Sequence, residues 1–241
     1  MINLALSLAA AVAAFLVFKL SGLPWLASLL PGLVALVATY IILARRTVKQ
    51  LEAVMGQVQK ELAARKVDRA VAALEAAFPL SRWQFLVEGQ LHAQIGTLLY
   101  IQKKFDEAEP HLVKSFVKMW PARAMLGAQQ YRRKEWAKME GTFEAALRAN
   151  KNEALLYAVF AWCQDKRGER KKAIEALTRG VAENPSDEKL KNLLNRTQND
   201  KRMKLAEAWG EQWYQFWLET PPAMGPGGGG FGGRQVKWGR R

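Results

Sequence analysis

Three short stretches decide the fold: KFDEA at residues 104–108, EWAKM at 135–139 and RKKA at 170–173. Each follows a helical stretch of similar length and a short polar or glycine-containing turn, and each opens a second helix. Aligned on the last residue of each stretch, they recur after 31 and then 34 residues. A repeat of that length built from two helices predicts helix pairs that stack on one another and share a continuous core.

The residues around these stretches agree in register. In each expected second helix, a small residue or Met is followed four positions later by a large apolar residue, and three positions after that by a small one. These triplets are Ala108, Leu112 and Ser115, then Met139, Phe143 and Ala146, then Ala173, Leu177 and Gly180. The expected first helices carry a large apolar residue followed by a small one, as in Ile95-Gly96, Leu126-Gly127 and Phe160-Ala161.

With this spacing the chain resembles the tetratricopeptide-repeat (TPR) family over roughly residues 67–194, with an earlier half-match at Ala70, Leu74 and Ala77. The resemblance implies an all-α solenoid of about three to four helix pairs, in which the first helices line a concave surface. It implies binding of proteins or peptides and names no particular partner.

Several aromatic and charged residues are expected on or beside that concave face. They are Tyr100, Tyr131, Arg132, Trp162 and Asp165. Aromatic side chains there would serve as anchors for a partner, and the alternative is that they fill gaps between neighbouring helices. The Lys, Asn and Arg with which some family members hold a peptide carboxylate are missing. The matching positions carry Ala93, Thr97, Ala124, Ala128 and Ala158.

The first 44 residues predict a transmembrane helical hairpin. Residues 2–20 are almost wholly apolar and residues 23–43 carry no charge, so each run is about long enough to cross the hydrocarbon core. Ser21-Gly22-Leu23-Pro24 supplies the turn, Trp25 suits the interface, and Pro31-Gly32 is expected to kink the second helix. The alternative is one span with a re-entrant segment.

Basic residues set the expected orientation. Arg45 and Arg46 follow the second span directly, whereas the hairpin tip offers only Lys19. Because positive residues stay on the cytoplasmic side, the repeats and both termini are expected in the cytoplasm, at a bacterial inner membrane. Residues 45–66 are expected to continue the second span as a connecting helix, and the solenoid with its terminal helix is expected over residues 67–218.

The end of the chain predicts two further features. One helix is expected from about Lys201 to Leu218, with an apolar stripe at Leu205, Trp209, Trp213 and Trp217. This stripe would cap the last repeat, or alternatively face a partner or the bilayer. Residues 219–241 are glycine-rich, are expected to be disordered, and end in the basic residues Arg234, Lys237, Arg240 and Arg241.

Composition excludes several classes of site. The single cysteine, Cys163, allows neither an intramolecular disulfide nor a cysteine-based metal cluster, and His92 and His111 lack metal-ligand spacing. No nucleotide-binding glycine pattern follows a strand, so we expect neither catalysis nor a cofactor. The sequence therefore predicts a membrane-anchored scaffold for protein partners, similar in layout to HemY-like bacterial proteins. The alternative is an adaptor for polyanions or anionic lipids, in which Arg45, Arg46 and the basic tail supply the affinity. The net charge of +14 makes acidic partners plausible without choosing among them.

Overall fold

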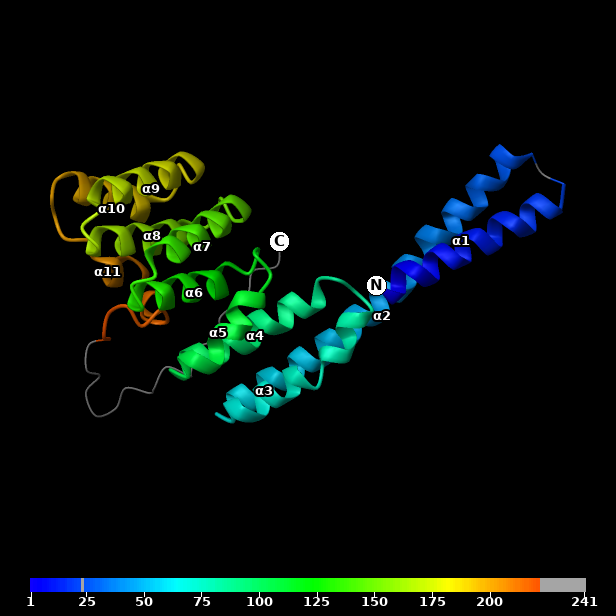
Figure 1. Ribbon diagram of the computed structural model, residues 1–241, viewed down its shortest axis with the longest axis horizontal. Coiled ribbons are helices and arrows are strands. Elements are labelled where there is room, and N and C mark those ends of the chain that lie inside the picture. Colours follow the sequence, from blue (N-terminus) through cyan, green and yellow to red (C-terminus); the bar gives the residue numbers. More distant parts are fainter. Residues whose placement is uncertain (23, 222–241) are drawn as a thin grey trace. The chain divides into compact units, whose positions relative to one another are not determined.

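The computed structural model describes residues 1–22 and 24–221, and over these residues it contains helices and connecting turns without a strand. The chain divides into two compact units, residues 1–91 and residues 92–221 of the described chain. Figure 1 shows both units as helical. The predicted all-α class is confirmed.

The first unit begins with two long helices, α1 (Ile2–Leu20) and α2 (Trp25–Ala63). Both are long and apolar enough to cross a membrane. They pack against each other as a hairpin (Figure 1). α2 runs without interruption through Pro31 and on through residues 45–63, so the connecting helix predicted beyond the second span is a continuation of that span.

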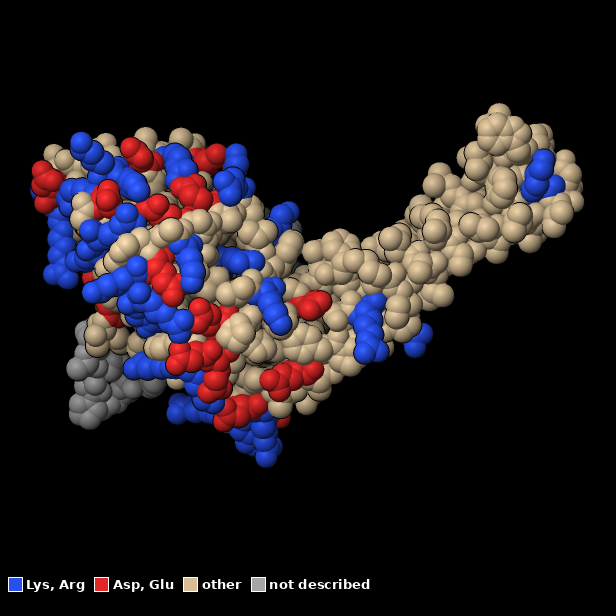
Figure 2. Space-filling view, in the orientation of Figure 1, with Lys and Arg blue, Asp and Glu red and all other residues tan. Residues whose placement is uncertain are grey.

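The hairpin buries polar and small residues and exposes large apolar ones. Its buried positions are Asn3 and Ser7 of α1 and Ser28, Gly32 and Thr47 of α2. Asn3 Nδ2 donates to Thr47 Oγ1 across the two helices at 3.2 Å. Small side chains at such a seam let two backbones approach closely, as membrane helices do. Figure 2 shows that the outer surface of the hairpin is almost free of charged side chains.

The rest of the first unit is short. α3 (Val67–Glu75) packs on α2 and buries Ala70 and Leu74 completely. A 3₁₀ helix, η1 (Phe78–Arg82), leads to α4 (Val87–Ile101), and the division between the units falls inside α4, after Leu91. The structure groups α3 with α2 because α3 buries its apolar face there.

The second unit consists of helices that pair in sequence order. After the end of α4 come α5 (Phe105–Lys114), α6 (Trp120–Arg132), α7 (Trp136–Ala149), α8 (Ala154–Lys166), α9 (Arg170–Glu183) and α10 (Glu188–Gln198). α6 packs on α7, α8 on α9, and α10 on α8 and α9. Every residue of the three triplets that carry the repeat is buried.

Two glycines explain how closely the helices of a pair approach. A Cβ atom on Gly127 of α6 would lie 2.4 Å from the ring of Phe143 of α7, and one on Gly96 of α4 would lie 2.8 Å from the side chain of Leu112 of α5. Neither position has room for a side chain, because real Cβ contacts are longer. The small residue in Ile95-Gly96 and Leu126-Gly127 therefore permits close packing at these two positions.

The predicted single helix over residues 201–218 is wrong. The structure has two short helices instead, α11 (Leu205–Trp209) and α12 (Glu211–Tyr214). They are separated by Gly210, whose φ of +54° is in the left-handed region that glycine adopts without steric cost. Trp217 also has a positive φ, of 51°, so the backbone turns twice within this stretch.

Candidate functional site

The aromatic residues predicted for a concave face lie in the second unit, and two of the three, Tyr100 and Trp162, are buried. Tyr100 is at the end of α4, Tyr131 at the end of α6 and Trp162 in α8. The Tyr131 and Trp162 rings are 5.6 Å apart between centroids and meet edge to face. Tyr100 is fully buried and Trp162 is 4% exposed. We call these three residues the aromatic face.

The chain's own residues 205–219, named here the C-terminal segment, lie on the aromatic face. The Trp213 ring packs edge to face on Trp162, with centroids 5.3 Å apart. The Tyr100 hydroxyl donates a hydrogen bond of 2.8 Å to the backbone carbonyl of Phe216. Trp213 and Phe216 are fully buried as a result. Tyr100 and Trp162 are therefore not open to a partner while the C-terminal segment lies on them.

The stripe predicted for the terminal helix is buried, although not as one helical face. Leu205 and Trp213 are fully buried and Trp209 is 9% exposed. Trp217 is partly exposed, and the Lys103 ammonium lies 4.2 Å from the centroid of its ring, close enough for a cation–π contact. The stripe is therefore packed within the chain, with Trp213 against Trp162 of α8 and Trp217 beside Lys103, which follows α4.

Arg132 and Tyr100 form the polar part of this contact. Arg132 Nη2 donates to the Tyr100 hydroxyl at 3.0 Å, and its guanidinium lies 3.8 Å from the centroid of the Phe105 ring. Burial raises the pKa of Tyr100 well above its ordinary value, although the nearby Arg132 charge opposes this shift. The phenol is therefore neutral near pH 7 and keeps its proton for the hydrogen bond to the C-terminal segment.

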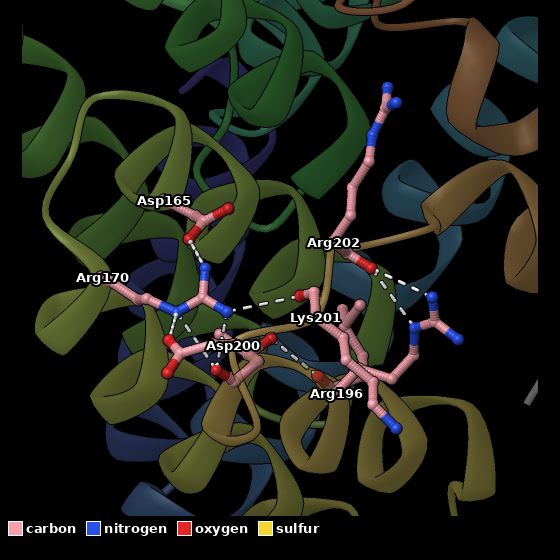
Figure 3. Close-up of polar contacts among 8 residues, drawn as sticks. Asp165, Arg170, Arg196, Asp200, Lys201 and Arg202 are labelled. Carbon is pink, nitrogen blue, oxygen red and sulfur yellow. Dashed lines mark hydrogen bonds and ion pairs between the residues drawn. The ribbon is translucent and has the colours of Figure 1, made fainter.

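The last predicted groove residue, Asp165, has a structural partner. Its carboxylate pairs with Arg170 Nη1 at 2.7 Å, and Arg170 also reaches the turn that follows α10 (Figure 3). The same guanidinium donates to the backbone carbonyls of Thr197 and Lys201, at 2.9 and 3.3 Å from Nη2, and pairs with Asp200 at 3.0 Å. Asp165 therefore helps to hold Arg170 and is not a free recognition residue.

A second arginine holds the chain just after this turn. Arg196 donates through Nε and Nη2 to the backbone carbonyl of Arg202, at 3.3 and 3.1 Å (Figure 3). Arg202 in turn lies 3.7 Å from the carboxylate of Glu219, which accepts a 2.9 Å hydrogen bond from Trp213 Nε1. Both ends of the C-terminal segment are thus held by polar contacts. Sequence reasoning missed this set of contacts, because it depends on the turn at residues 199–204.

The remaining candidate residues have simpler positions. Cys163 is fully buried, and burial raises the pKa of its thiol, which is typical of a packing residue. His92 and His111 lie closer than their sequence positions suggested, with their Nδ1 atoms 3.0 Å apart. Within the described part of the chain, no group of three or more potential ligands could hold a metal ion.

The membrane-flank residues Trp25, Arg45 and Arg46 are all exposed on α2. Trp25 opens α2, and Arg45 and Arg46 lie near Thr47, whose hydroxyl meets Asn3. The predicted basic tail, with Arg234, Lys237, Arg240 and Arg241, lies outside the described residues.

No protein-family model matches the chain, and no curated protein matches it either.

Proposed function

We propose that this chain is a membrane-anchored scaffold that binds protein partners through TPR-like helix pairs. The hairpin of α1 and α2 is the anchor, the second unit is the binding domain, and no step of the proposal requires a catalyst or a cofactor. The repeats lie on the cytoplasmic side in this proposal, because Arg45 and Arg46 follow the second apolar span.

One observation carries the proposal: the aromatic face already holds a polypeptide segment. The C-terminal segment contributes both a ring, that of Trp213, and a backbone carbonyl, that of Phe216, to contacts with α8 and α4. Ring stacking together with a backbone hydrogen bond is the chemistry by which a groove binds a peptide. A partner segment rich in aromatic residues would use the same contacts after the C-terminal segment has moved away.

The helix pairing supports the TPR-like part of the proposal. The triplets that define the register are buried, and a Cβ atom on Gly96 or Gly127 would collide with the partner helix. This helix packing alone names no partner, because one fold serves many functions. The partner class comes from the aromatic face.

A competition experiment tests the proposal. The full chain is purified from membranes in mild detergent together with its bound proteins, and a synthetic peptide of residues 205–219 is added in excess. We expect the peptide to release the partner, because both occupy the aromatic face, and we expect a scrambled peptide of the same composition to release nothing. A partner that stays bound under both peptides shows that the aromatic face is not the binding site.

A pair of variants, one in the C-terminal segment and one outside it, provides a second test with its own control. Trp217→Ala removes a partly exposed ring of the C-terminal segment together with its contact to Lys103. We expect this change to loosen the segment and to increase partner recovery. Val113→Ala alters an exposed apolar side chain of α5 that belongs to neither the segment nor the aromatic face, and should leave recovery unchanged.

A further inference from the structure

The stretch between α3 and α4 is tied to the start of α1. The N-terminal ammonium of Met1 donates to the backbone carbonyl of Arg82, and the backbone N–H of Asn3 donates to the carbonyl of Trp83 at 3.4 Å. These residues belong to the same compact unit, and Figure 1 shows the N-terminus beside the loop that leads into α4. The backbone of residues 82–83 is thus held next to the first turn of an apolar helix.

This attachment fixes a depth relative to the membrane that α1 and α2 are suited to cross. α1 spans about 28 Å at 1.5 Å per residue, close to the thickness of the hydrocarbon core. Its first turn is therefore at the boundary between hydrocarbon and headgroups. Thr47 of α2 lies at the same level, because its hydroxyl accepts a hydrogen bond from Asn3. The exposed cations Arg45 and Arg46 lie next to Thr47 in the sequence.

Two aromatic side chains at or directly after the attached residues 82–83 are exposed. Trp83 is 38% exposed and Phe85 is 60% exposed, whereas Leu86 is partly exposed and Val87 is buried. Trp in particular is favoured at the headgroup region, where its apolar ring and its polar N–H both find suitable surroundings. The exposed Arg82 lies next to Trp83 in the sequence. The arrangement combines apolar rings with cations, which complement the phosphates of anionic lipids.

We propose that residues 78–86, named here the interfacial segment, bind the surface of an anionic bilayer as a third membrane contact. Trp83 and Phe85 enter the headgroup region, and Arg82, Arg45 and Arg46 lie beside lipid phosphates. This contact is independent of the proposed partner site, because it involves only the first unit. It holds the start of α4 at the bilayer surface.

The test measures depth with spin labels on the full chain. Single cysteines replace Phe85, Leu33 or Gln59, and the parent protein supplies the background because Cys163 is fully buried. Leu33 is 60% exposed within the apolar half of α2, whereas Gln59 lies twelve residues, or about 18 Å, beyond Thr47 on the same helix. Each labelled protein is reconstituted in phosphatidylcholine vesicles containing roughly a quarter phosphatidylglycerol.

The readout is the accessibility of the label to oxygen, which enters the bilayer, relative to a nickel chelate, which stays in water. We expect the ratio to be highest at Leu33, intermediate at Phe85 and severalfold lower at Gln59. In vesicles of phosphatidylcholine alone, the Phe85 ratio should fall toward the Gln59 value.

Three results would overturn the proposal. A Phe85 ratio equal to that of Gln59 in anionic vesicles places the segment in water. The same result is expected if the interfacial segment binds a protein instead of lipid, because the vesicles contain no other protein. An unchanged Phe85 ratio in vesicles of phosphatidylcholine alone removes the role of anionic lipid. A water-like ratio at Leu33 shows that α2 does not span the bilayer, and the depth argument then fails with it.

Discussion

The α1–α2 hairpin and the helix pairs of residues 92–221 use the same backbone conformation with opposite side-chain distributions. The hairpin buries Asn3, Ser7 and Thr47 and exposes large apolar residues such as Leu30 and Leu33. The helix pairs bury residues such as Phe143 and Trp213, and Figure 2 shows their surface covered with charged side chains. A helix next to lipid gains nothing by burying Leu, so its packing depends on small and polar contacts. A helix in water is stabilised mainly by burying its apolar face.

The largest effect is expected where the second unit buries its largest side chain. Trp213→Ala removes a fully buried ring that packs on Trp162 and leaves a cavity, which costs about 3–5 kcal/mol of unfolding free energy. Thermal unfolding of the full chain in detergent, followed by near-UV circular dichroism, measures the loss. A change smaller than that produced by Trp25→Ala, which alters an exposed ring, contradicts the burial of Trp213.

The next change tests the opposite environment. Leu33→Arg places a charge on the outer surface of α2, and in the middle of a bilayer this costs about 2.5–3.5 kcal/mol of insertion free energy. The fraction of the chain that resists alkaline extraction from membranes should fall accordingly. Val113→Arg, at a comparably exposed position of α5, should leave that fraction unchanged because the side chain faces water in the folded protein. Equal behaviour of the two variants would remove the distinction between the two regions.

Helix spacing in the second unit provides a third test. Gly127→Ala introduces a Cβ atom that collides with Phe143, and the overpacking should cost about 1–3 kcal/mol of stability. Gly141 of α7 has nothing within 4 Å of the equivalent atom, so Gly141→Ala should instead stabilise the helix by roughly 0.5–1 kcal/mol. Chemical denaturation of both variants measures the contrast. Two changes of the same sign would contradict the close approach of α6 and α7.

The smallest expected change in stability concerns the charged side chains on the surface of the helix pairs, which the hairpin surface almost lacks. Burial tends to raise the pKa of Glu140, but hydrogen bonds from Lys172, Gln164 and Arg167 outweigh it and lower that pKa below its ordinary value of 4.5. A carboxylate with a lowered folded-state pKa stabilises the protein above pH 4.5, and this contribution is lost as pH falls through the folded value. Glu140→Gln should therefore cost about 1 kcal/mol or less at pH 7 and nothing in strong acid.

Stability measured at several pH values, with the exposed Glu107→Gln as control, tests that dependence. A deficit of Glu140→Gln that persists unchanged below the folded-state pKa would show that the charge of Glu140 is not its source.

The sequence alone predicted the features that depend on contacts between residues close together in the chain. Helix periodicity and the spacing of Gly96, Gly127 and the triplets predicted helices and buried positions, because each depends on contacts within a pair. The spacing of Leu205, Trp209, Trp213 and Trp217 was misleading, since four-residue steps mimic a helix although Gly210 interrupts it. The contacts of the C-terminal segment with Tyr100 and Trp162 join residues far apart in the sequence. Local patterns carry no information about such a contact.

The continuity of α2 has a mechanical consequence. Its 39 residues form one rod of about 58 Å, of which roughly the first half is apolar and the remainder carries α3. In the proposed anchored arrangement the apolar half of α2 lies in the bilayer, and a helix without a break would carry rotation about its axis to the other half. A change in bilayer thickness that tilts the apolar half would also move the far end sideways. α2 would then transmit rotation and tilt from the bilayer to α3.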